Sequence, residues 1–251
     1  MSQFKHLLPP SYKREAVSWV EDDCPSFDIG GFVVGDKVEI AYIYCKEPCV
    51  LAGVPFVNAV LDHLGLIYQW NFEEGDELES AEKIIVASVS GQCSNLLIAE
   101  RTCLNILSRA SGVATLARTA RQIKEQHNWH GYVAGTRKTT PGFRTVEKYA
   151  LLVGGVATHR LDLSQMVMLK DNHVWSTGSI TNAVKKARSA GGFFIKIEVE
   201  CNSIEEAMEA GAAGADIIML DNFSSMTIHG AAEEIKKHYP YVLIEASGVS
   251  V

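Results

Sequence analysis

The chain has 251 residues, of which 47% are hydrophobic and 21% charged, and its formal net charge is −7. This composition is typical of a folded globular protein and excludes an intrinsically disordered chain, while the negative balance disfavours non-specific binding to nucleic acid or anionic membranes. The six cysteines are scattered without a CxxC pair, which fits neither a zinc site nor a disulfide-dense secreted scaffold.

The N-terminus and the apolar runs indicate a soluble protein. Only Leu7 and Leu8 form an apolar run before the first prolines, which is too short for the hydrophobic region of a signal peptide. The longest nearly uncharged apolar run, 150–157, is much shorter than the roughly 20 residues that a membrane-spanning helix needs. We therefore expect a cytoplasmic protein with reduced thiols.

The N-terminal part of the chain predicts a small α+β domain with antiparallel or mixed strands. Helical patterns cover 11–23 and 54–65, and strand-like runs cover 37–45, 66–72 and 83–91. A long helical stretch then bridges the two parts of the chain.

That stretch covers 95–126, with a possible break at 110–112, and a regular alternation of strands and helices follows it. Strand-like runs occupy 132–136, 166–170, 193–200, 216–220 and 241–247, and the clearest helices between them occupy 180–192, 203–214 and 226–238. Such alternation predicts parallel strands covered by helices, in an α/β barrel or an open doubly wound sheet. We place an N-terminal α+β domain with the bridging helix at 1–108 and an α/β barrel domain at 109–251.

A polar side chain stands at the end of each of these five strands. The residues are Lys138, Lys170, Glu200, Asp221 and Ser247. Because the carboxyl ends of parallel strands meet at one edge and carry the active site of such folds, we expect these side chains to converge.

The charged residues near these strand ends are sorted by sign along the chain. Cations come first, at Arg137, Lys138, His159, Arg160 and Lys170, and carboxylates follow at Glu200 and Asp221, with Glu198 as a further candidate. Arginine and lysine suit carboxylates and phosphates, and carboxylates suit Mg²⁺. The pattern predicts metal-assisted chemistry on a phosphorylated or carboxylated small molecule. The segment Thr139-Thr140-Pro141 is also typical of a helix start, whose free amides would favour an anion.

One long segment carries a specific resemblance. The stretch GTRKTTPGFRTVEKYALLVGGVATHRLDLSQMVMLKDNHV, at 135–174, closely resembles the signature region of the type II phosphoribosyltransferases, specifically the quinolinate phosphoribosyltransferase family. The likeness continues through KIEVEC, MLDNF and EASG, and backward through ERTCLNILSRASGVAT. It covers most of the chain in order and at the family's spacing.

The resemblance implies an enzyme that joins quinolinate to phosphoribosyl pyrophosphate and releases pyrophosphate and CO2, giving nicotinate mononucleotide for NAD biosynthesis. It implies that Glu200 and Asp221 face the ribose hydroxyls and Mg²⁺, and that Ser247 and Gly248 begin the loop that holds the 5-phosphate. It also implies a homodimer or higher homo-oligomer in which Arg101 enters the neighbouring subunit's site. The residues that would line the dicarboxylate and phosphate pockets are Arg137, Lys138, His159, Arg160 and Lys170.

Other polar residues near the motif have plainer interpretations. Lys148 and Arg144 lie on the helix after the motif, where we expect them to be solvated or salt-bridged. His173 is ambiguous, and we favour a hydrogen bond within its loop over substrate contact. His127 and His130 have a metal-like spacing, but without a third ligand nearby we expect both at the surface.

The sequence departs from the family pattern at its C-terminus. Val249 stands where the family has a second glycine of the phosphate loop, and the pattern continues beyond the last residue, so we expect a truncated, incomplete barrel. Three alternatives follow: an inactive chain that only oligomerises with the full-length enzyme, an aldolase-like barrel with Lys170 as a Schiff-base lysine, and a sister activity that uses nicotinate.

Overall fold

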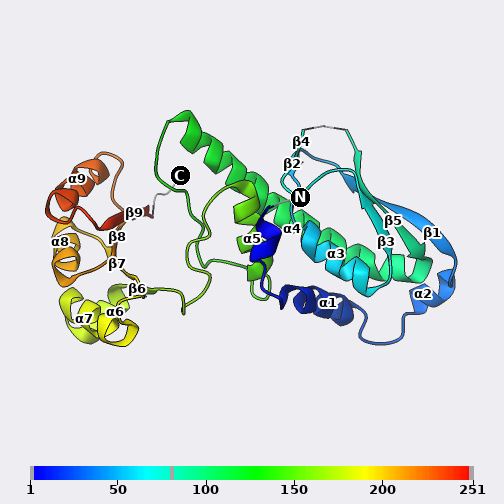
Figure 1. Ribbon diagram of the computed structural model, residues 1–251, viewed down its shortest axis with the longest axis horizontal. Helices are drawn as coiled ribbons and strands as arrows, with labels where there is room; N and C mark the ends of the chain where they lie inside the picture. Colours follow the sequence, from blue (N-terminus) through cyan, green and yellow to red (C-terminus); the bar gives the residue numbers. More distant parts are fainter. Residues whose placement is uncertain (1–2, 80–81, 249–251) are drawn as a thin grey trace. The chain divides into compact units, whose positions relative to one another are not determined.

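We describe the protein from a computed structural model, which covers residues 3–79 and 82–248. The chain forms two compact units that divide between Leu161 and Asp162, and each unit is described by itself (Figure 1). Among the helices of the described residues, none has the length and apolar character that crossing a bilayer requires.

The first unit contains a three-stranded antiparallel sheet in the order β1-β5-β3. These strands are β1 (Val38–Cys45), β5 (Ile84–Gln92) and β3 (Ile67–Trp70), as the sequence predicts. The strands β2 (Cys49–Val50) and β4 (Glu77–Leu78) form a separate two-stranded antiparallel ribbon. In the chain, β2 follows β1 and β4 precedes β5.

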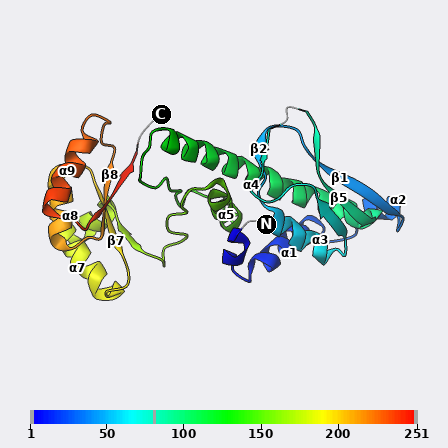
Figure 2. The same cartoon turned by 45° about the horizontal axis from the view of Figure 1, so that its top comes forward.

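The described residues of this unit also form one 3₁₀ helix and five α-helices. They are η1 (Gln3–Leu7), α1 (Tyr12–Asp23), α2 (Ile29–Val34), α3 (Val54–His63), α4 (Cys93–Gln126) and α5 (Arg144–Gly154). The helix α4 packs against α3 and β5 (Figure 2).

The break predicted in α4 at 110–112 is wrong, because α4 runs through it without interruption. The small residues there serve close packing instead. The hydroxyl of Ser111 accepts a hydrogen bond from the amide of Ala52 (3.1 Å) and donates one to its carbonyl (3.3 Å). A Cβ on Gly53 would lie 3.0 Å from the Cβ of Ala110, so this part of the chain crosses α4 at short range.

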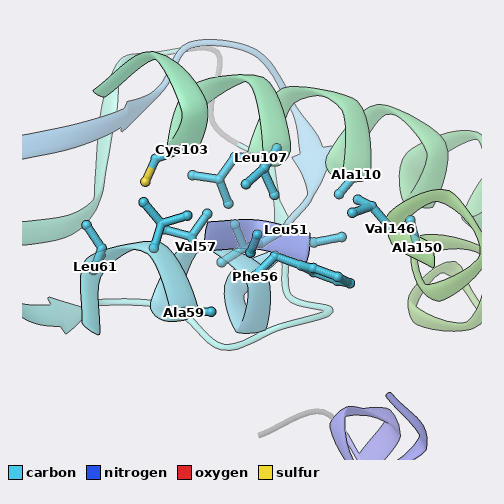
Figure 3. Packing of buried hydrophobic residues seen from close by; sticks show 14 of the residues in the cluster. Leu51, Phe56, Val57, Ala59, Leu61, Cys103, Leu107, Ala110, Val146 and Ala150 are labelled. Carbon is cyan, nitrogen blue, oxygen red and sulfur yellow. The ribbon is translucent and has the colours of Figure 1, made fainter. Parts of the chain in front are cut away.

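The core of the first unit joins three helices (Figure 3). Most of its labelled side chains come from α3 (Phe56, Val57, Ala59, Leu61), α4 (Cys103, Leu107, Ala110) and α5 (Val146, Ala150), and Leu51 joins them from the segment before α3. Each large apolar side chain that is fully buried contributes about 1.5–3 kcal/mol. The α5 helix is therefore held firmly against α4.

The second unit is a four-stranded parallel sheet in the order β6-β7-β8-β9, as predicted. Its strands are β6 (Val167–Leu169), β7 (Ile197–Cys201), β8 (Ile217–Asp221) and β9 (Leu243–Ser247). Its helices are α6 (Asp171–Thr177), α7 (Ile180–Gly191), α8 (Ile204–Ala213) and α9 (Ile228–His238). In both views α7, α8 and α9 lie on one side of the sheet (Figures 1 and 2).

The strands of the second unit have two different faces, because successive side chains alternate. Val199 and Ile218 point to the helices and join a buried cluster with Val184 of α7 and Ile235 of α9. The neighbouring positions, such as Glu200 and Met219, therefore lie on the opposite face.

Two local predictions around the motif are wrong. Residues 132–136 do not form a strand, because Ala134 makes only an isolated parallel bridge with Ala157. The helix expected to start at Thr139-Thr140-Pro141 begins at Arg144, since the amide of Phe143 bonds the carbonyl of Thr140 (3.0 Å) in a turn. The domain boundary predicted at 108/109 lies inside α4 and stays a prediction.

Candidate functional site

Two segments of the first unit carry cationic side chains, and each follows a backbone that is hydrogen-bonded to the other. The amide of Gly135 donates to the carbonyl of Ala157 (2.9 Å), and the amide of Ala157 donates to the carbonyl of Val133 (2.9 Å). These bonds hold the two backbones side by side. Segment 137–140 follows one of them and segment 158–160 follows the other.

The first segment is a tight loop that presents two side chains to solvent. The amide of Lys138 donates to the hydroxyl of Thr136 (3.0 Å), and the amide of Thr139 donates to the carbonyl of Arg137 (2.9 Å). Arg137 and Lys138 are exposed. Their backbone is thus fixed locally while their charged ends are accessible.

The second segment turns sharply at His159. This residue has φ = 55°, a left-handed conformation that non-glycine residues adopt at a cost of about 1–2 kcal/mol. The hydroxyl of Thr158 donates to the carbonyl of His159 (2.8 Å), and Arg160 is buried. The turn places His159 and Arg160, both predicted site residues, directly after the bridge at Ala157.

The expectation that Lys148 is solvated or salt-bridged is wrong. The side chain is only 2% exposed, and its ammonium donates to the carbonyls of Thr158 and Arg160, the latter at 3.1 Å. Burial lowers the pKa of Lys148, and the nearby charges of Arg144, Arg137 and Arg160 lower it further. The sequence did not reveal this role of Lys148 because its partners are backbone carbonyls. Its position one helix turn after Arg144 was only a weak signal for it. Arg144 is exposed, as expected.

In the second unit, Lys170 and Glu200 form an ion pair. Lys170 stands directly after β6, at the start of α6, and Glu200 lies on β7. The ring Nδ1 of His173 accepts a hydrogen bond from the amide of Lys170 (3.1 Å). The prediction that His173 hydrogen-bonds its own loop is confirmed, and this bond orients the backbone that carries Lys170.

Carboxylates gather on the face of this sheet that points away from the helices. Glu198 and Glu200 lie two residues apart on β7, and Glu200 is in register with Met219, which is in register with Glu245. Asp221 lies two residues after Met219 on β8 and so shares this face. Glu198 is fully buried.

Glu245 was missed as a site candidate, although the alternation of residues in 241–247 was a signal for it. We call the four residues Glu198, Glu200, Asp221 and Glu245 the acidic face. Its oxygen donors are of the kind that Mg²⁺ prefers.

The end of this sheet is shaped by Gly248. Asp221 and Ser247 are partners in the register of β8 and β9, and the amide of Asn222 donates to the carbonyl of Ser247 (3.0 Å). Gly248 has φ = 81°, and a Cβ there would lie 2.8 Å from the nitrogen of Asn222. Only glycine fits this position without a backbone shift. Val249, on which the predicted departure from the family pattern falls, lies outside the described residues.

Arg101 lies apart from the other predicted residues of its unit. It lines a groove of about 1150 Å³ between β1 and α4, together with Tyr42, Leu97 and Leu116. Within the described residues of this unit, the cationic segments 137–140 and 158–160 contribute nothing to its lining.

The histidines with metal-like spacing are at the surface, as predicted. His127 and His130 are both exposed. The Nδ1 atom of His127 lies 2.9 Å from the carbonyl of Ile123, which is a local contact at the end of α4.

Two sequence models of a known protein family match this chain. The sequence model described as "Quinolinate phosphoribosyl transferase, N-terminal domain" matches residues 28–111. The model described as "Quinolinate phosphoribosyl transferase, C-terminal domain" matches residues 113–250. The two matches meet inside α4.

Individual relatives agree with these matches. The chain is 49% identical to the carboxylating nicotinate-nucleotide pyrophosphorylase of Rattus norvegicus, over 96% of this chain and 81% of that protein. It is 46% identical to the protein of the same name from Dictyostelium discoideum, over 96% of this chain and 85% of that protein. The crystal structure of NadC from Streptococcus pyogenes superposes with a TM-score of 0.86 at 35% identity, covering 97% of this chain and 86% of that one.

Proposed function

This chain belongs to the quinolinate phosphoribosyl transferase family, and from that premise we propose that it converts quinolinate and phosphoribosyl pyrophosphate into nicotinate mononucleotide, pyrophosphate and CO2. It is a pentosyltransferase of NAD biosynthesis. The observation that carries this conclusion is the 46–49% identity to carboxylating nicotinate-nucleotide pyrophosphorylases over 96% of the chain.

The cationic segments are suited to the dicarboxylate. Quinolinate carries two carboxylates on neighbouring ring carbons, and a guanidinium group can bind a carboxylate through two parallel hydrogen bonds. We assign this binding to Arg137, Lys138, His159 and Arg160, and we propose Lys170 of the second unit as a further anion-binding residue. Their support is the exposure of Arg137 and Lys138 and the bridged backbones that carry both segments.

The acidic face is suited to the ribose and a divalent cation. Glu200 and Asp221 are proposed to bind the ribose hydroxyls and Mg²⁺, and the ion, when bound, would neutralise the charge of the leaving pyrophosphate. One oxygen of Glu200 pairs with Lys170, and one of Asp221 accepts from the Asn222 side chain (2.6 Å). Each carboxylate therefore keeps a second oxygen for these contacts.

The chemistry needs positioning and electrostatics more than a proton relay. The pyridine nitrogen forms a bond to the anomeric carbon as the bond from that carbon to pyrophosphate breaks, and nearby carboxylates stabilise the positive charge that develops on the ribose. The ring carbon next to the new pyridinium nitrogen then releases CO2, because that nitrogen accepts the electron pair of the broken bond. A proton from solvent completes the product.

The turn at Ser247 and Gly248 is proposed to hold the 5-phosphate. The support is the positive φ of Gly248 and its close approach to Asn222, which require glycine at this turn. Backbone amides in turns of this kind can bind anions.

We also propose that the enzyme is a cytoplasmic homo-oligomer in which Arg101 serves the site of a neighbouring subunit. The support is the groove that Arg101 lines, because Tyr42, Leu97 and Leu116 on its walls are 49%, 44% and 73% exposed. Exposed apolar surface of this kind marks interaction sites.

An inactive chain that only oligomerises is not favoured, since both domain families match and the charged residues of both segments are present. The aldolase-like alternative for Lys170 is not favoured either, because its amine is paired with Glu200.

The test is product formation by the purified chain, given phosphoribosyl pyrophosphate, Mg²⁺ and either quinolinate or nicotinate. We expect nicotinate mononucleotide and an equal amount of CO2 from quinolinate, and no product from nicotinate. A folded chain that forms no product from quinolinate would overturn the proposal.

A mixing experiment tests the shared site. Arg101→Ala and Lys170→Met chains, each with little activity alone, should recover part of the activity when they are mixed and allowed to exchange subunits. Absence of recovery despite exchange would show that Arg101 acts within its own subunit or not at all.

A further inference from the structure

Two oppositely charged residues on α5 are buried next to each other. Glu147 is 4% exposed and Lys148 is 2% exposed. Ionised side chains are seldom buried unless they are paired or hydrogen-bonded, because removing them from water is costly. Neither side chain has been assigned a role in the proposed chemistry, so their burial calls for an explanation.

Glu147 holds the end of the first cationic segment. Its carboxylate accepts hydrogen bonds from the amide of Thr140 (3.0 Å) and from the hydroxyl of Thr140 (2.7 Å). Arg109 of α4 pairs with the same carboxylate (2.7 Å) and also donates to the Thr140 hydroxyl (3.3 Å). Although burial raises the pKa of Glu147, these partners outweigh it and hold the pKa below its usual value. The group is therefore ionised when it binds Thr140, two residues after Lys138.

Lys148 holds the second segment. Its ammonium bonds the carbonyls of Thr158 and Arg160, which flank His159 on either side. His159 has a left-handed backbone conformation that is unfavourable for its side chain. Two charge-assisted hydrogen bonds to the neighbouring carbonyls offset that cost. The direction in which His159 and Arg160 leave the backbone thus depends on Lys148.

The two side chains start from consecutive residues of one packed helix. Val146 and Ala150, on the same helix, are fully buried against α3 and α4, so α5 has little freedom to shift. One helix turn therefore fixes both loops relative to each other, in addition to the bridge between Ala134 and Ala157.

We infer that Glu147 and Lys148 are positioning residues that brace the segments 137–140 and 158–160 at the spacing a vicinal dicarboxylate requires. The inference rests on the proposed function for the identity of that ligand. Neither residue touches the substrate; each acts through backbone or hydroxyl groups of the loop that it holds. If either side chain is removed, the segment that it holds can move while the other segment stays in place. The two segments then bind the two carboxylates of the ligand less tightly.

The experiment compares Lys148→Met and Glu147→Gln with Lys13→Met, which makes the same lysine-to-methionine change at an exposed position of α1. The probe is benzene-1,2-dicarboxylate, which keeps both neighbouring carboxylates but has no ring nitrogen to accept a ribosyl group. Its Kd is measured by titration calorimetry, and kcat and KM for quinolinate are measured alongside. Thermal unfolding reports on stability.

For Lys148→Met and Glu147→Gln we expect Kd and KM to rise about tenfold or more, with a smaller change in kcat, because a mispositioned binding group weakens ligand binding before it affects later steps. We expect ethylamine to restore binding partly in Lys148→Ala, since the small amine can replace the missing ammonium. The Lys13→Met variant should match the unaltered chain. Folded variants whose Kd and KM equal those of the unaltered chain would overturn the inference, as would a lowered melting temperature with unchanged Kd.

These outcomes are distinct from failure of the proposed function. If the unaltered chain binds the dicarboxylate but forms no nucleotide, the proposed reaction is wrong while the brace can still be tested by Kd. If the unaltered chain does not bind the dicarboxylate at all, the brace is overturned, while the proposed function is decided by product formation from quinolinate.

Discussion

The packing of α5 on α4 makes a strong prediction at Gly154. A Cβ at this position would lie 2.5 Å from the carbonyl oxygen of Ala114 and 2.5 Å from the Cβ of Ala117. Neither atom can rotate away, because one belongs to the backbone and the other is fixed to it. Gly154→Ala therefore forces α5 away from α4, and the bond from Arg118 Nε to the Gly154 carbonyl (3.2 Å) lengthens with it.

The magnitude follows from two opposing terms. Overpacking of a well-packed contact costs about 1–3 kcal/mol, and it is higher here because helix backbones must separate. Gly154 is the last residue of α5, so alanine there returns at most about 1 kcal/mol of helix propensity. We expect Gly154→Ala to lower the free energy of unfolding by about 2 kcal/mol, which corresponds to a fall of about 4–8 °C in Tm.

A matched control lies on the facing helix. Gly112 is exposed in the middle of α4, and a Cβ there would have no neighbour within 4 Å. Gly112→Ala should therefore raise the free energy of unfolding by about 0.5–1 kcal/mol from helix propensity alone. Circular dichroism during thermal and urea unfolding measures both variants. If Gly154→Ala is as stable as Gly112→Ala, the close contact of α4 and α5 is not as described.

Three further predictions concern the site and its surroundings. Lys170→Met should lower kcat/KM for quinolinate about 100-fold while the chain stays folded, because we propose that its ammonium binds the substrate's negative charge. A loss under threefold in steady-state kinetics would contradict that proposed role. Gly248→Ala should raise KM for phosphoribosyl pyrophosphate about tenfold, because glycine alone adopts φ = 81° beside Asn222 without strain. An unchanged KM would show that the turn at Gly248 does not bind the phosphate. Burial raises the pKa of Glu74 from 4.5 to about 7, so its contribution to stability is complete below pH 4.5 and is lost as the pH rises through 7, by about 3 kcal/mol. Urea titrations at pH 5 and pH 8 should show this loss of unfolding free energy in the unaltered chain and a smaller loss in Glu74→Gln. An equal loss in both chains would contradict the prediction.

The charged residues of the two units are held in place in different ways. In the first unit, Arg137 and Lys138 are carried on a loop whose shape is set by hydrogen bonds to Thr136 and Thr140. In the second unit, Glu200 and Asp221 are carried on strands, where the register of the sheet sets their spacing. We expect substitutions in loop-supporting residues of the first unit to affect binding more gradually than shifts in the sheet of the second unit.

Several elements were predictable because their signal is local. The four parallel strands of the second unit follow from short apolar runs bounded by helices that begin at serine caps, such as Ser179 and Ser203. The 132–136 run has the same local signal, yet only Ala134 pairs, with Ala157. Whether an extended segment joins a sheet depends on a partner strand far along the chain, and its own residues do not report that partner.

Residue order alone is enough to predict that the chain alternates strands with helices and that cations precede carboxylates along it. It also predicts that Lys170, Glu200, Asp221 and Ser247 follow or end parallel strands. These properties depend on residue type and short-range spacing. The burial of Lys148 and the shared face of Glu245 and Glu200 follow from long-range packing. Both outcomes depend on which backbone or strand comes to lie beside the residue. Every residue has a backbone carbonyl, so residue types do not show that the carbonyl of Arg160 will accept a hydrogen bond from Lys148.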